Sequence, residues 1–492
     1  MTEHVDVIVV GAGLSGIGAG YHLRARCPDR SFVILEGRDR IGGTWDLFRY
    51  PGIRSDSDMY TLGFSFRPWT EAKAIADGPA ILNYLHETVR EHDLDRHIRL
   101  QHRMVRAEWS SEAARWTIEL DIGPDGEKRQ MTCAFLFMCS GYYNYQRGYT
   151  PDFAGIDGFA GRVVHPQFWP DDLDYAGKRV IVIGSGATAV TLVPEMAKQA
   201  AQVTMLQRSP TYIVSRPSED GIANAMRRVL PARLAYALTR WKNVAMQQFF
   251  YRIARKRPAE TKQRLVGMVR DELGSGYDVE THFTPSYNPW DQRICLVPDA
   301  DLFAAIRSGA AAVVTGQIDR FVADGIRLTT GEVLPADMVV TATGLELQLM
   351  SDVPLWIDGK RVDPAETLNY KGMMFSGIPN LAYTFGYTNA SWTLKADLTS
   401  EYVCRLLNTM RKRGLRQCTP QPSGAIEPAP FLDFTSGYVQ RALARFPKQG
   451  SRKPWRLNQN YMRDVMTLRF GSVDDEMVFS NPEPRRDRQR AA

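Results

Sequence analysis

The sequence is poor in cysteine and contains no long apolar run. Its six cysteines lie far apart among 492 residues, and no two of them form a Cys-x-x-Cys pair. This spacing argues against a zinc site and against a dithiol redox centre, and a reducing compartment fits it best. No apolar stretch approaches the roughly 18 residues that a membrane-spanning helix needs. The N-terminus also lacks the basic segment and short apolar core of a signal peptide, so we expect a cytoplasmic protein.

Glycine and proline are not in excess either. The 39 glycines and 28 prolines are near the average for this length, which excludes collagen-like and disordered classes. With 44% hydrophobic and 24% charged residues, the chain can bury a large core, and its length predicts two or three packed units. The net charge of +6 is modest for this size. The distribution of the charges is therefore more informative than their sum.

A glycine-rich turn directly follows the first apolar run. Residues 5–10 are almost continuously apolar, which is typical of a buried parallel strand, and a helical pattern and a second strand over 31–35 come after the turn. The turn contains Gly11, Gly13, Ser15 and Gly16, and Glu36 ends the second strand. Such glycines let a pyrophosphate approach a helix N-terminus, and Glu36 can accept hydrogen bonds from ribose hydroxyls. The pattern predicts a dinucleotide site, although the glycines alone do not separate FAD from NAD.

A second glycine pair, Gly42-Gly43, comes just after this unit. Two-dinucleotide flavoproteins place such a pair against the pyrophosphate of FAD, so we assign the first domain to FAD; an ordinary turn is the alternative. The loop over 49–58 is rich in charge, and loop charges beside a site are functional candidates, although a surface ion-pair cluster explains them at least as well. The further residues expected to bind this cofactor are Gly43, Thr44, Trp45, Asp46, Leu47, Arg54, Ser55, Asp56 and Met104.

The same pattern occurs again near residue 180. A strand over 179–183 leads into a turn, a helix to about 198 and a strand over 202–206. The turn consists of Gly184, Ser185, Gly186, Ala187, Thr188 and Ala189. The position that matches Glu36 is Gln207, and Arg208 follows it. A carboxylate there would repel a 2′-phosphate, whereas Arg208 can pair with one and Ser209 can add a hydroxyl donor, so this site should prefer NADP over NAD. A solvated Arg208 is the alternative.

Residues 221–274 combine a helical pattern with interleaved aromatic and basic side chains, and acidic residues are almost absent from most of the segment. We interpret it as a helical insertion whose apolar face covers the active site or makes peripheral contact with an anionic membrane. A solvated basic face is the more common explanation of such a pattern. A nucleic-acid partner is not expected, because no known reader motif accompanies the charge.

Two further buried strands end in small residues, at 135–141 and at 337–344. Two such ends fit two nucleotide domains, one inserted in the other. We therefore expect an α/β fold with two dinucleotide-binding, Rossmann-like domains, in which the NADP domain is inserted in the FAD domain and carries the helical insertion. The expected boundaries are 1–150 for the first part of the FAD domain, 151–335 for the NADP domain with its insert at 221–274, and 336–492 for the second part, which ends in a basic tail at 485–490.

Between the two fingerprints, Phe159 to Pro170 match the pattern Phe-x-Gly-x-x-x-His-x-x-x-Trp-Pro. In this position the pattern resembles that of type I Baeyer–Villiger monooxygenases, in the flavin-containing monooxygenase superfamily. The resemblance implies an enzyme that binds FAD and NADPH. NADPH would reduce FAD, O2 would add to give a C4a-peroxyflavin, and a small-molecule ketone would become an ester or lactone. Sulfides or thioamides would accept oxygen at sulfur.

The resemblance also assigns roles within the charged segments. It makes Arg293, in the segment from Tyr287 to Pro298, the active-site arginine that stabilises the anionic oxidant, and Asp56 the carboxylate that holds it. Gln292 departs from many relatives, which have a lysine there for the NADP 2′-phosphate, so Arg208 is left as the obvious phosphate partner. His165 then acts as a joint between the domains rather than as a ligand or base.

Two other functions stay open at this point. One is a flavin monooxygenase that oxygenates only nitrogen or sulfur. The other is a flavin- and NADP-binding redox sensor with little turnover, suggested by the basic insert. The pattern at 159–170 favours ketone oxidation over the first of these, and NADPH oxidation that follows added ketone would reject the second. The sequence does not predict the physiological substrate, the regiochemistry or the oligomeric state.

Overall fold

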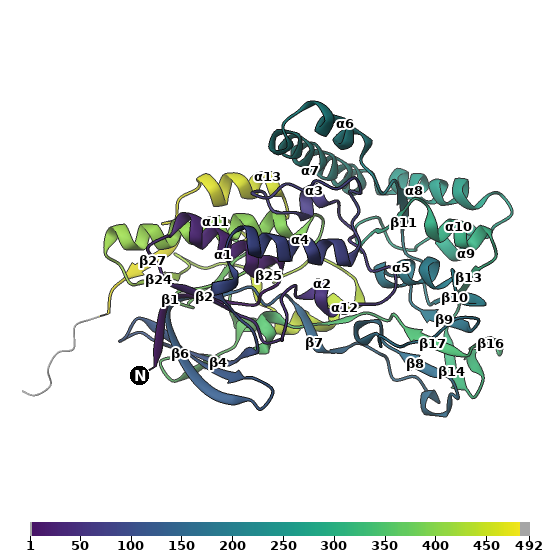
Figure 1. Cartoon of the computed structure of the whole chain (residues 1–492), viewed down its shortest axis with the longest axis horizontal. Coiled ribbons are helices and arrows are strands. Elements are labelled where there is room, and N and C mark those ends of the chain that lie inside the picture. Colours follow the sequence, from purple (N-terminus) through teal and green to yellow (C-terminus); the bar gives the residue numbers. More distant parts are fainter. Residues whose placement is uncertain (1, 483–492) are drawn as a thin grey trace, which may run out of the picture.

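The structure is a computed structural model that describes residues 2–482, so the basic tail at 485–490 lies outside the described residues. The elements form two neighbouring bodies, each built on its own sheet (Figure 1). The body with β1 and α1 lies on the left of the view and the body with β9 and α5 on the right. Both βαβ units predicted from the glycine turns are confirmed.

The first sheet has nine strands in the order β20-β19-β4-β5-β6-β1-β2-β3, with β23 paired to β6. Its strands are β1 (Glu3–Val10), β2 (Phe32–Leu35), β3 (Ile98–Arg99), β4 (His102–Ser110), β5 (Arg115–Ile122), β6 (Glu127–Met138), β19 (Leu355–Ile357), β20 (Lys360–Val362) and β23 (Leu381–Tyr383). β1 is parallel to both β2 and β6 and is almost wholly buried, as a strand covered on two faces must be. Helices α1 (Leu14–Arg26), α4 (Gly78–Glu91) and α11 (Trp392–Arg413) pack together over one face.

The second sheet is parallel throughout, in the order β13-β10-β9-β17-β8. Its strands are β8 (Arg162–Val164), β9 (Arg179–Ile183), β10 (Gln202–Gln207), β13 (Ala311–Thr315) and β17 (Met338–Thr341). Helices α5 (Ala187–Met196) and α10 (Asp301–Arg307) pack against its core. The sequence pattern placed the end of the inserted unit at 335, and because β17 belongs to this sheet we propose that the unit extends to about residue 341.

The remaining elements are short and mostly flank the two sheets. In the second body and its surroundings they are α9 (Val279–Phe283), β11 (Ile213–Arg216), β12 (Cys295–Pro298), β14 (Ile318–Val322), β15 (Gly325–Leu328) and β16 (Val333–Pro335). Around the first they are α2 (Thr44–Leu47), α3 (Met59–Leu62), β21 (Asn369–Tyr370), β22 (Met374–Phe375), β24 (Gln417–Pro420), β25 (Pro428–Pro430), α12 (Gly437–Ala442), β26 (Lys448–Gly450), α13 (Tyr461–Asp464), the π-helix η7 (Val465–Phe470) and β27 (Met477–Ser480).

The first sheet takes its strands from two separate stretches of the chain, 3–138 and 355–383, and the second sheet takes its strands from 162–341. We propose on this ground that the NADP domain is inserted in the FAD domain. Two of the connections between the bodies, which we call the linker strands, run side by side as an antiparallel pair, β7 (Tyr143–Gly148) with β18 (Leu345–Leu347).

His165 lies on this pair of linker strands. Its Nε2 donates a hydrogen bond to the backbone oxygen of Gly344 at 3.2 Å, and its Nδ1 accepts one from the backbone N–H of Gln167 at 3.2 Å. The ring packs directly on Gly148, where a Cβ would lie 2.0 Å from the imidazole Cε1. These two bonds fix one neutral tautomer, which supports the interpretation of His165 as a joint.

The helical insert divides between the two bodies. Helices α6 (Gly221–Val229) and α7 (Ala232–Lys256) share the core of the first body, through Tyr236 and Val244 among others, whereas α8 (Pro258–Leu273) places Val266 and Val269 in the core of the second. The segment is therefore helical as predicted, but it is not one independent unit.

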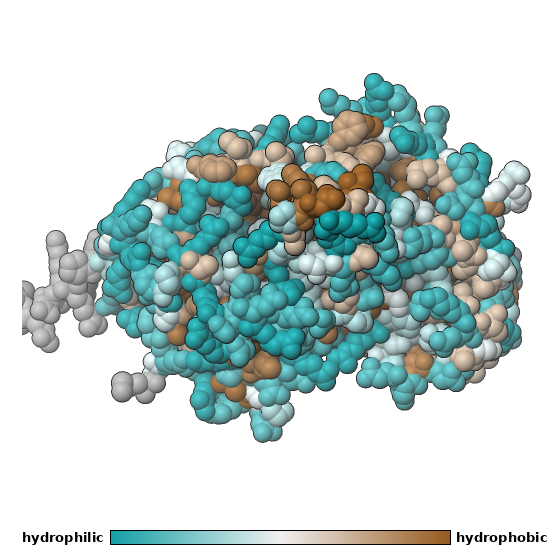
Figure 2. All heavy atoms as spheres, turned by 45° about the horizontal axis from the view of Figure 1, so that its top comes forward, coloured by the Kyte–Doolittle hydropathy of each residue, from teal (hydrophilic) through white to brown (hydrophobic). Residues whose placement is uncertain are grey.

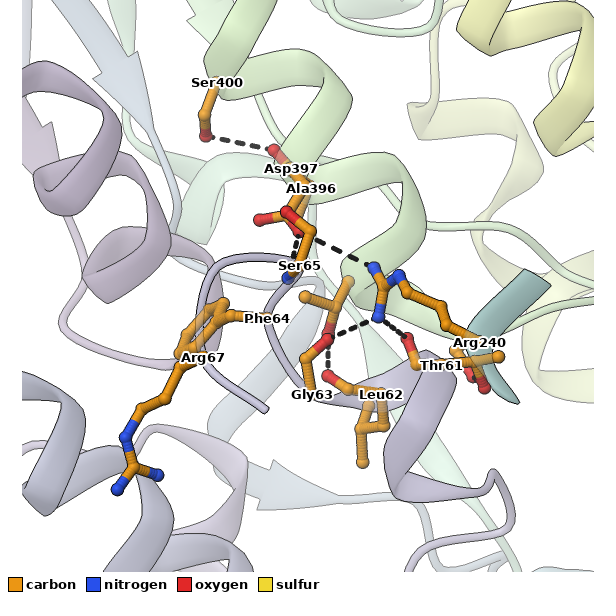
Figure 3. Close-up of polar contacts among 12 residues, drawn as sticks. Thr61, Leu62, Gly63, Phe64, Ser65, Arg67, Arg240, Ala396, Asp397 and Ser400 are labelled. Carbon is orange, nitrogen blue, oxygen red and sulfur yellow. Dashed lines mark hydrogen bonds and ion pairs between the residues drawn. The ribbon is translucent and has the colours of Figure 1, made fainter. Parts of the chain in front are cut away.

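A buried arginine fixes α7 to the first body. Arg240 Nη1 donates to the backbone oxygens of Tyr60 at 2.8 Å and Gly63 at 2.7 Å, and Nη2 lies 3.6 Å from Asp397 on α11. Figure 3 shows the guanidinium reaching from α7 between the 61–65 loop and Asp397. The carbonyls belong to the end of α3, where backbone oxygens lack helical partners, so Arg240 caps that helix with a positive charge.

All six cysteines are buried and unpaired. Among residues 2–482 no helix is both long and apolar enough to cross a membrane. The same stretch contains no group of three or more histidine, cysteine, aspartate or glutamate side chains placed to hold a metal ion.

Candidate functional site

A cavity of about 1170 Å³ opens between the two bodies, where the carboxyl ends of the parallel strands of both sheets meet. The predicted residues that line it are Gly11, Gly13, Ser15, Glu36, Gly43, Thr44, Trp45, Leu47, Arg54, Ser55, Asp56, Met104, Gly184, Ser185, Gly186, Ala187, Thr188, Arg208, Ser209 and Arg293. The fold thus brings both fingerprints and the charged loop to one space.

Three predicted cofactor-binding residues do not line the cavity. Gly16 and Ala189 face into the turns on which α1 and α5 begin, and Asp46 lies under the wall, where it pairs with Arg38 at 2.6 Å. A Cβ on Gly16 would lie only 1.8 Å from the backbone oxygen of Gly11, so this glycine serves the packing of the turn. These three residues support the wall of the cavity but do not line it.

The first glycine turn leaves no room for side chains. Gly11 has a φ of +102°, and a Cβ there would lie 2.6 Å from the backbone oxygen of Cys139. A Cβ on Gly43 would lie 3.0 Å from the Cα of Gly13, so the two glycine pairs touch through their backbones. Helix α1 has Gly13 as its N-cap and no side chain satisfies its first N–H groups. The turn therefore presents uncapped donors to the cavity, which suits a pyrophosphate.

Glu36 is held at the end of β2 by two backbone donors. Its carboxylate accepts hydrogen bonds from the N–H of Ala12 at 2.8 Å and of Arg38 at 2.9 Å, and only 7% of the residue is exposed. Burial raises the pKa of Glu36 above its ordinary value, although both N–H donors oppose that shift. The carboxylate is thus fixed in place at the cavity wall, as recognition of a ribose requires.

The second turn repeats this geometry with more open space. Gly184 has a φ of +136°, and a Cβ there would lie 2.4 Å from the backbone oxygen of Ala342, whereas Gly186 has nothing within 4 Å. Helix α5 also begins without a side-chain cap. The Ser185 hydroxyl lies 2.8 Å from that of Thr211 and donates to the backbone oxygen of Ser209.

The position that matches Glu36 points away from the cavity. Gln207 is buried, and its amide donates to the backbone oxygen of His282 at 2.7 Å and to the hydroxyl of Thr315 at 2.9 Å. Arg208 is exposed at the cavity and forms no ion pair with any of residues 2–482. An exposed guanidinium without a protein partner is ready for an anion such as a 2′-phosphate.

Arg293 and Asp56 meet inside the cavity, as the resemblance implied. Nη1 of Arg293 lies 3.2 Å from Oδ2 of Asp56, although the residues are far apart in the sequence. The 37% exposure of the Arg293 side chain is exposure to the cavity. Burial opposes the charge, but Tyr438, Tyr142 and Asp56 outweigh it and hold the pKa of Arg293 well above its usual range. Nε is buried and has no hydrogen-bond partner among the described residues, so the exposed part of the side chain is what faces the cavity.

An aromatic wall faces this ion pair. Tyr142 stacks on Trp392 with ring centroids 4.9 Å apart, and its hydroxyl lies 2.7 Å from that of Tyr143. Trp392 Nε1 donates to Ser15 in the first glycine turn at 2.7 Å, so the wall is tied to the nucleotide site. Burial raises the pKa of Tyr438, also in the lining, to about 12. The Tyr438 phenol therefore stays neutral, and the tyrosines of the wall offer hydroxyls within an apolar surface.

Sequence reasoning missed this wall. Tyr142, Tyr143 and Tyr145 directly follow the small-residue turn at Ser140-Gly141, and aromatic residues at the end of a buried strand were a signal that could have been used. The lining segment 436–441 carries no motif. This segment reaches the cavity only through the tertiary fold, where the chain comes back to the first body.

Comparisons with known proteins agree with this geometry. A family model for flavin-binding monooxygenase-like proteins matches residues 69–258, and one for an NAD(P)-binding Rossmann-like domain matches residues 9–77. The FAD-containing monooxygenase EthA of Mycobacterium tuberculosis is 58% identical over 478 residues, which cover 97% of each chain. The chain belongs to the family of FAD-containing monooxygenases. Membership of the flavin monooxygenase superfamily, predicted from the sequence, is thereby confirmed.

Other members and distant folds extend the comparison. The probable FAD-binding monooxygenase AlmA of Acinetobacter baylyi is 48% identical and covers 97% of this chain and 96% of its own. A steroid monooxygenase bound to NADP superposes with a TM-score of 0.77 at 22% identity, covering 97% of this chain and all of that one. Cyclohexanone monooxygenase bound to epsilon-caprolactone gives a TM-score of 0.75 at 20% identity, with 97% and 100% coverage. These structures confirm the expected two-domain α/β fold for this FAD-containing monooxygenase.

Proposed function

We propose that this monooxygenase uses NADPH and O2 to convert ketones to esters or lactones, and that it also oxygenates sulfides and thioamides at sulfur. The observation that carries the proposal is the Arg293–Asp56 pair, placed in an aromatic cavity that both nucleotide turns share. A protein of the same fold, cyclohexanone monooxygenase, has been solved with a lactone, epsilon-caprolactone.

FAD and NADP(H) are the cofactors, as the two turns predicted. The relatives are FAD-containing monooxygenases, and a structure of the same fold was solved with FAD and NADP. The residues of this chain fit both groups, because each turn ends in an uncapped helix N-terminus at the cavity and a Cβ at Gly11 or Gly184 would strike the backbone. When bound, FAD accepts a hydride from NADPH and activates O2 for transfer of one oxygen atom to the substrate.

Arg293 supplies a fixed positive charge where the substrate meets the flavin. Its guanidinium stays protonated across the working pH range, because its pKa lies above the usual value. Asp56 accepts a hydrogen bond from Nη1, and the part of the guanidinium that is exposed to the cavity can donate to an oxygen that gains negative charge during transfer. A donor oriented in advance in a cavity with little water stabilises such charge more than solvent does.

The aromatic wall determines what can enter. Tyr142, Trp392 and Tyr438 present ring surfaces that exclude water and accept apolar carbon chains or rings. The Tyr142–Tyr143 hydroxyl pair can orient a carbonyl oxygen toward Arg293. Both features favour uncharged ketones over charged amines, which weighs against an enzyme limited to nitrogen.

Product analysis tests the proposal. Purified protein with FAD, NADPH and a panel of linear, cyclic and aryl ketones plus one thioamide should yield esters or lactones as well as an oxygenated sulfur product. Sulfur oxygenation without any ester would support the narrower sulfur and nitrogen activity instead. NADPH oxidation that does not respond to any substrate would favour a redox-sensing role.

Arg293→Ala is expected to lower ester formation by about 100- to 1000-fold, the usual loss when one stabilising donor is removed. Flavin content and binding of NADPH should stay near those of the parent, because neither glycine turn contains this residue. Arg293→Lys is the matched control: it keeps a charge but loses the planar fork, and should recover only part of the activity. Ester formation by Arg293→Ala at the parental rate would refute this role.

A further inference from the structure

Helix α7 exposes an apolar surface that an ordinary surface helix would bury. Its face toward the first body mixes apolar residues such as Tyr236 and Val244 with buried Arg240 and Gln248, and Asn243 and Gln247 donate to Asp58 at the start of α3. The opposite face carries Leu234, Leu238, Trp241, Met246, Phe249 and Phe250, which are 40–59% exposed. A helix normally buries its apolar stripe, so this one presents to the outside the surface that water least favours.

The apolar side chains of α7 belong to a larger surface. Met462, Met466 and Phe470, on the turn of α13 and η7, are 48%, 64% and 67% exposed, and Trp241 contacts Tyr461 of α13 with ring centroids 5.7 Å apart. Figure 2 shows hydrophobic side chains gathered on the upper part of the molecule, over the region where Figure 1 places α6, α7 and α13, with hydrophilic residues around them. We call the nine exposed residues named in this and the preceding paragraph the apolar patch.

The charge around the apolar patch has one sign. Residues 221–257 contain nine arginines and lysines and neither aspartate nor glutamate. Arg228, Arg233, Arg252 and Lys256 form no ion pair with any of the described residues. Basic side chains without partners surrounding an apolar helix face are the features by which an amphipathic helix lies on an anionic membrane, with its apolar residues among the acyl chains and its cations among the headgroups.

The inner face prevents α7 from turning its apolar side inward. Rotation would remove Arg240 from the three partners that satisfy its charge, Tyr60, Gly63 and Asp397, and breaking a buried charged network is strongly destabilising. The polar docking therefore holds the apolar patch outward as a permanent feature of the fold.

We propose that the apolar patch and the basic residues of 221–257 dock this protein on an anionic lipid surface. A second copy of the chain fits less well, because a symmetric contact would place the same unpaired cations face to face. Nucleic acid would pair with the cations but leave the aromatic and methionine side chains in water. A lipid surface satisfies both parts of the face at once.

Vesicle sedimentation with the full-length, FAD-loaded protein tests this proposal. The protein should pellet with vesicles of phosphatidylcholine and phosphatidylglycerol, should pellet far less with phosphatidylcholine alone, and should lose binding as salt rises. Phe249→Ser combined with Phe250→Ser is expected to weaken binding to the anionic vesicles about tenfold or more, since two inserted rings are lost. Arg252→Glu combined with Lys256→Glu should weaken it and flatten its salt dependence.

The matched control is Val333→Ser combined with Val478→Ser, two apolar residues that are 39% and 50% exposed but lie outside the apolar patch. These substitutions should leave vesicle binding unchanged. All variants should retain the flavin content and turnover of the parent, which shows that they fold. Absence of binding to anionic vesicles, or equal binding by the phenylalanine variant and its control, would overturn the proposal. The proposal would also be overturned if sedimentation velocity showed that the parent protein is a dimer and that the phenylalanine variant is a monomer.

Discussion

The two nucleotide turns have the same strand–turn–helix plan but differ in how tightly they are packed. In the first, Gly16 lies so close to Gly11 that a Cβ would come within 1.8 Å of the Gly11 oxygen, and Gly13 touches the second glycine pair. In the second, the position of Gly16 is already an alanine, Ala189, and Gly186 faces open space. The first turn admits only one arrangement of its backbone. The second has room around it.

The residues at the ends of β2 and β10, the second strand of each βαβ unit, also differ in how tightly they are packed. Glu36 is buried, fixed by two backbone donors and turned to the cavity, whereas Gln207 is turned away and the exposed Arg208 is the residue that we predict to bind the nucleotide. A dense, buried site holds a cofactor that stays with the protein, and an open site with an exposed cation suits a coenzyme that binds and leaves in each turnover. The contrast thus matches a resident FAD and an exchanging NADPH.

The largest effect is expected at the tight turn. Gly16→Ala should destabilise the fold by about 3 kcal/mol or more, since its Cβ overlaps backbone that cannot move, and the protein should purify with little flavin. The ratio of flavin to protein absorbance and the unfolding temperature measure this. Ala189→Gly is the matched change in the other turn and should cost only about 1 kcal/mol with flavin retained. Equal losses in the two variants would contradict the difference in packing.

A smaller and more selective effect is expected at the open turn. Arg208→Ala should raise the KM for NADPH by about 10- to 100-fold, because one charge-assisted hydrogen bond to the 2′-phosphate is lost. It should leave the KM for NADH and the flavin content unchanged. Steady-state kinetics with both coenzymes check this. Gln292 provides no charge in place of Arg208, so a normal KM for NADPH in the variant would show that another group binds the 2′-phosphate.

Most of the scaffold could be predicted because it follows from local pattern. Continuous apolar runs before a glycine turn define β1 and β9, and an acid or its replacement at the end of the next strand defines the nucleotide preference. The Arg293–Asp56 contact was reached only through the resemblance to a family, since the two residues lie far apart in the sequence and no spacing rule joins them.

Other features depended on tertiary contacts that no local pattern encodes. The boundary at 335 stays a prediction, and β17, which lies beyond it, pairs in the second sheet, because the composition of a buried strand does not tell which sheet it joins. Helix α7 was recognised as basic and apolar, but only the structure shows that it buries Arg240 and Gln248 while large apolar side chains such as Phe249 stay exposed. The cavity wall at 436–441 has no signal, since its position is set by the return of the chain to the first body.

The smallest effect is expected where the two turns are joined. His165 fills the space beside the linker strands, so His165→Ala should leave the flavin content and the KM for NADPH within about twofold, but should raise the share of NADPH oxidised without product severalfold, because a looser joint lets water enter the cavity. Hydrogen peroxide formed per NADPH measures this. Unchanged coupling would reduce the stretch from Phe159 to Pro170 to a family signature.

Low pH should also weaken the contacts of His165 with the linker strands and so lower the stability of the protein. Burial lowers the pKa of His165 below 6.5, so the folded state favours the neutral ring that donates to Gly344 and accepts from Gln167. The unfolded chain binds a proton first as pH falls, and stability is therefore lost on acidification from about pH 6.5 through the lower pKa of the folded state. His165→Gln cannot take up that proton. The fall in unfolding temperature between about pH 7.5 and pH 5.5 should be smaller in this variant than in the parent. If the fall is equal, the acid sensitivity comes instead from His92, His97 or His282, whose pKa values burial also lowers.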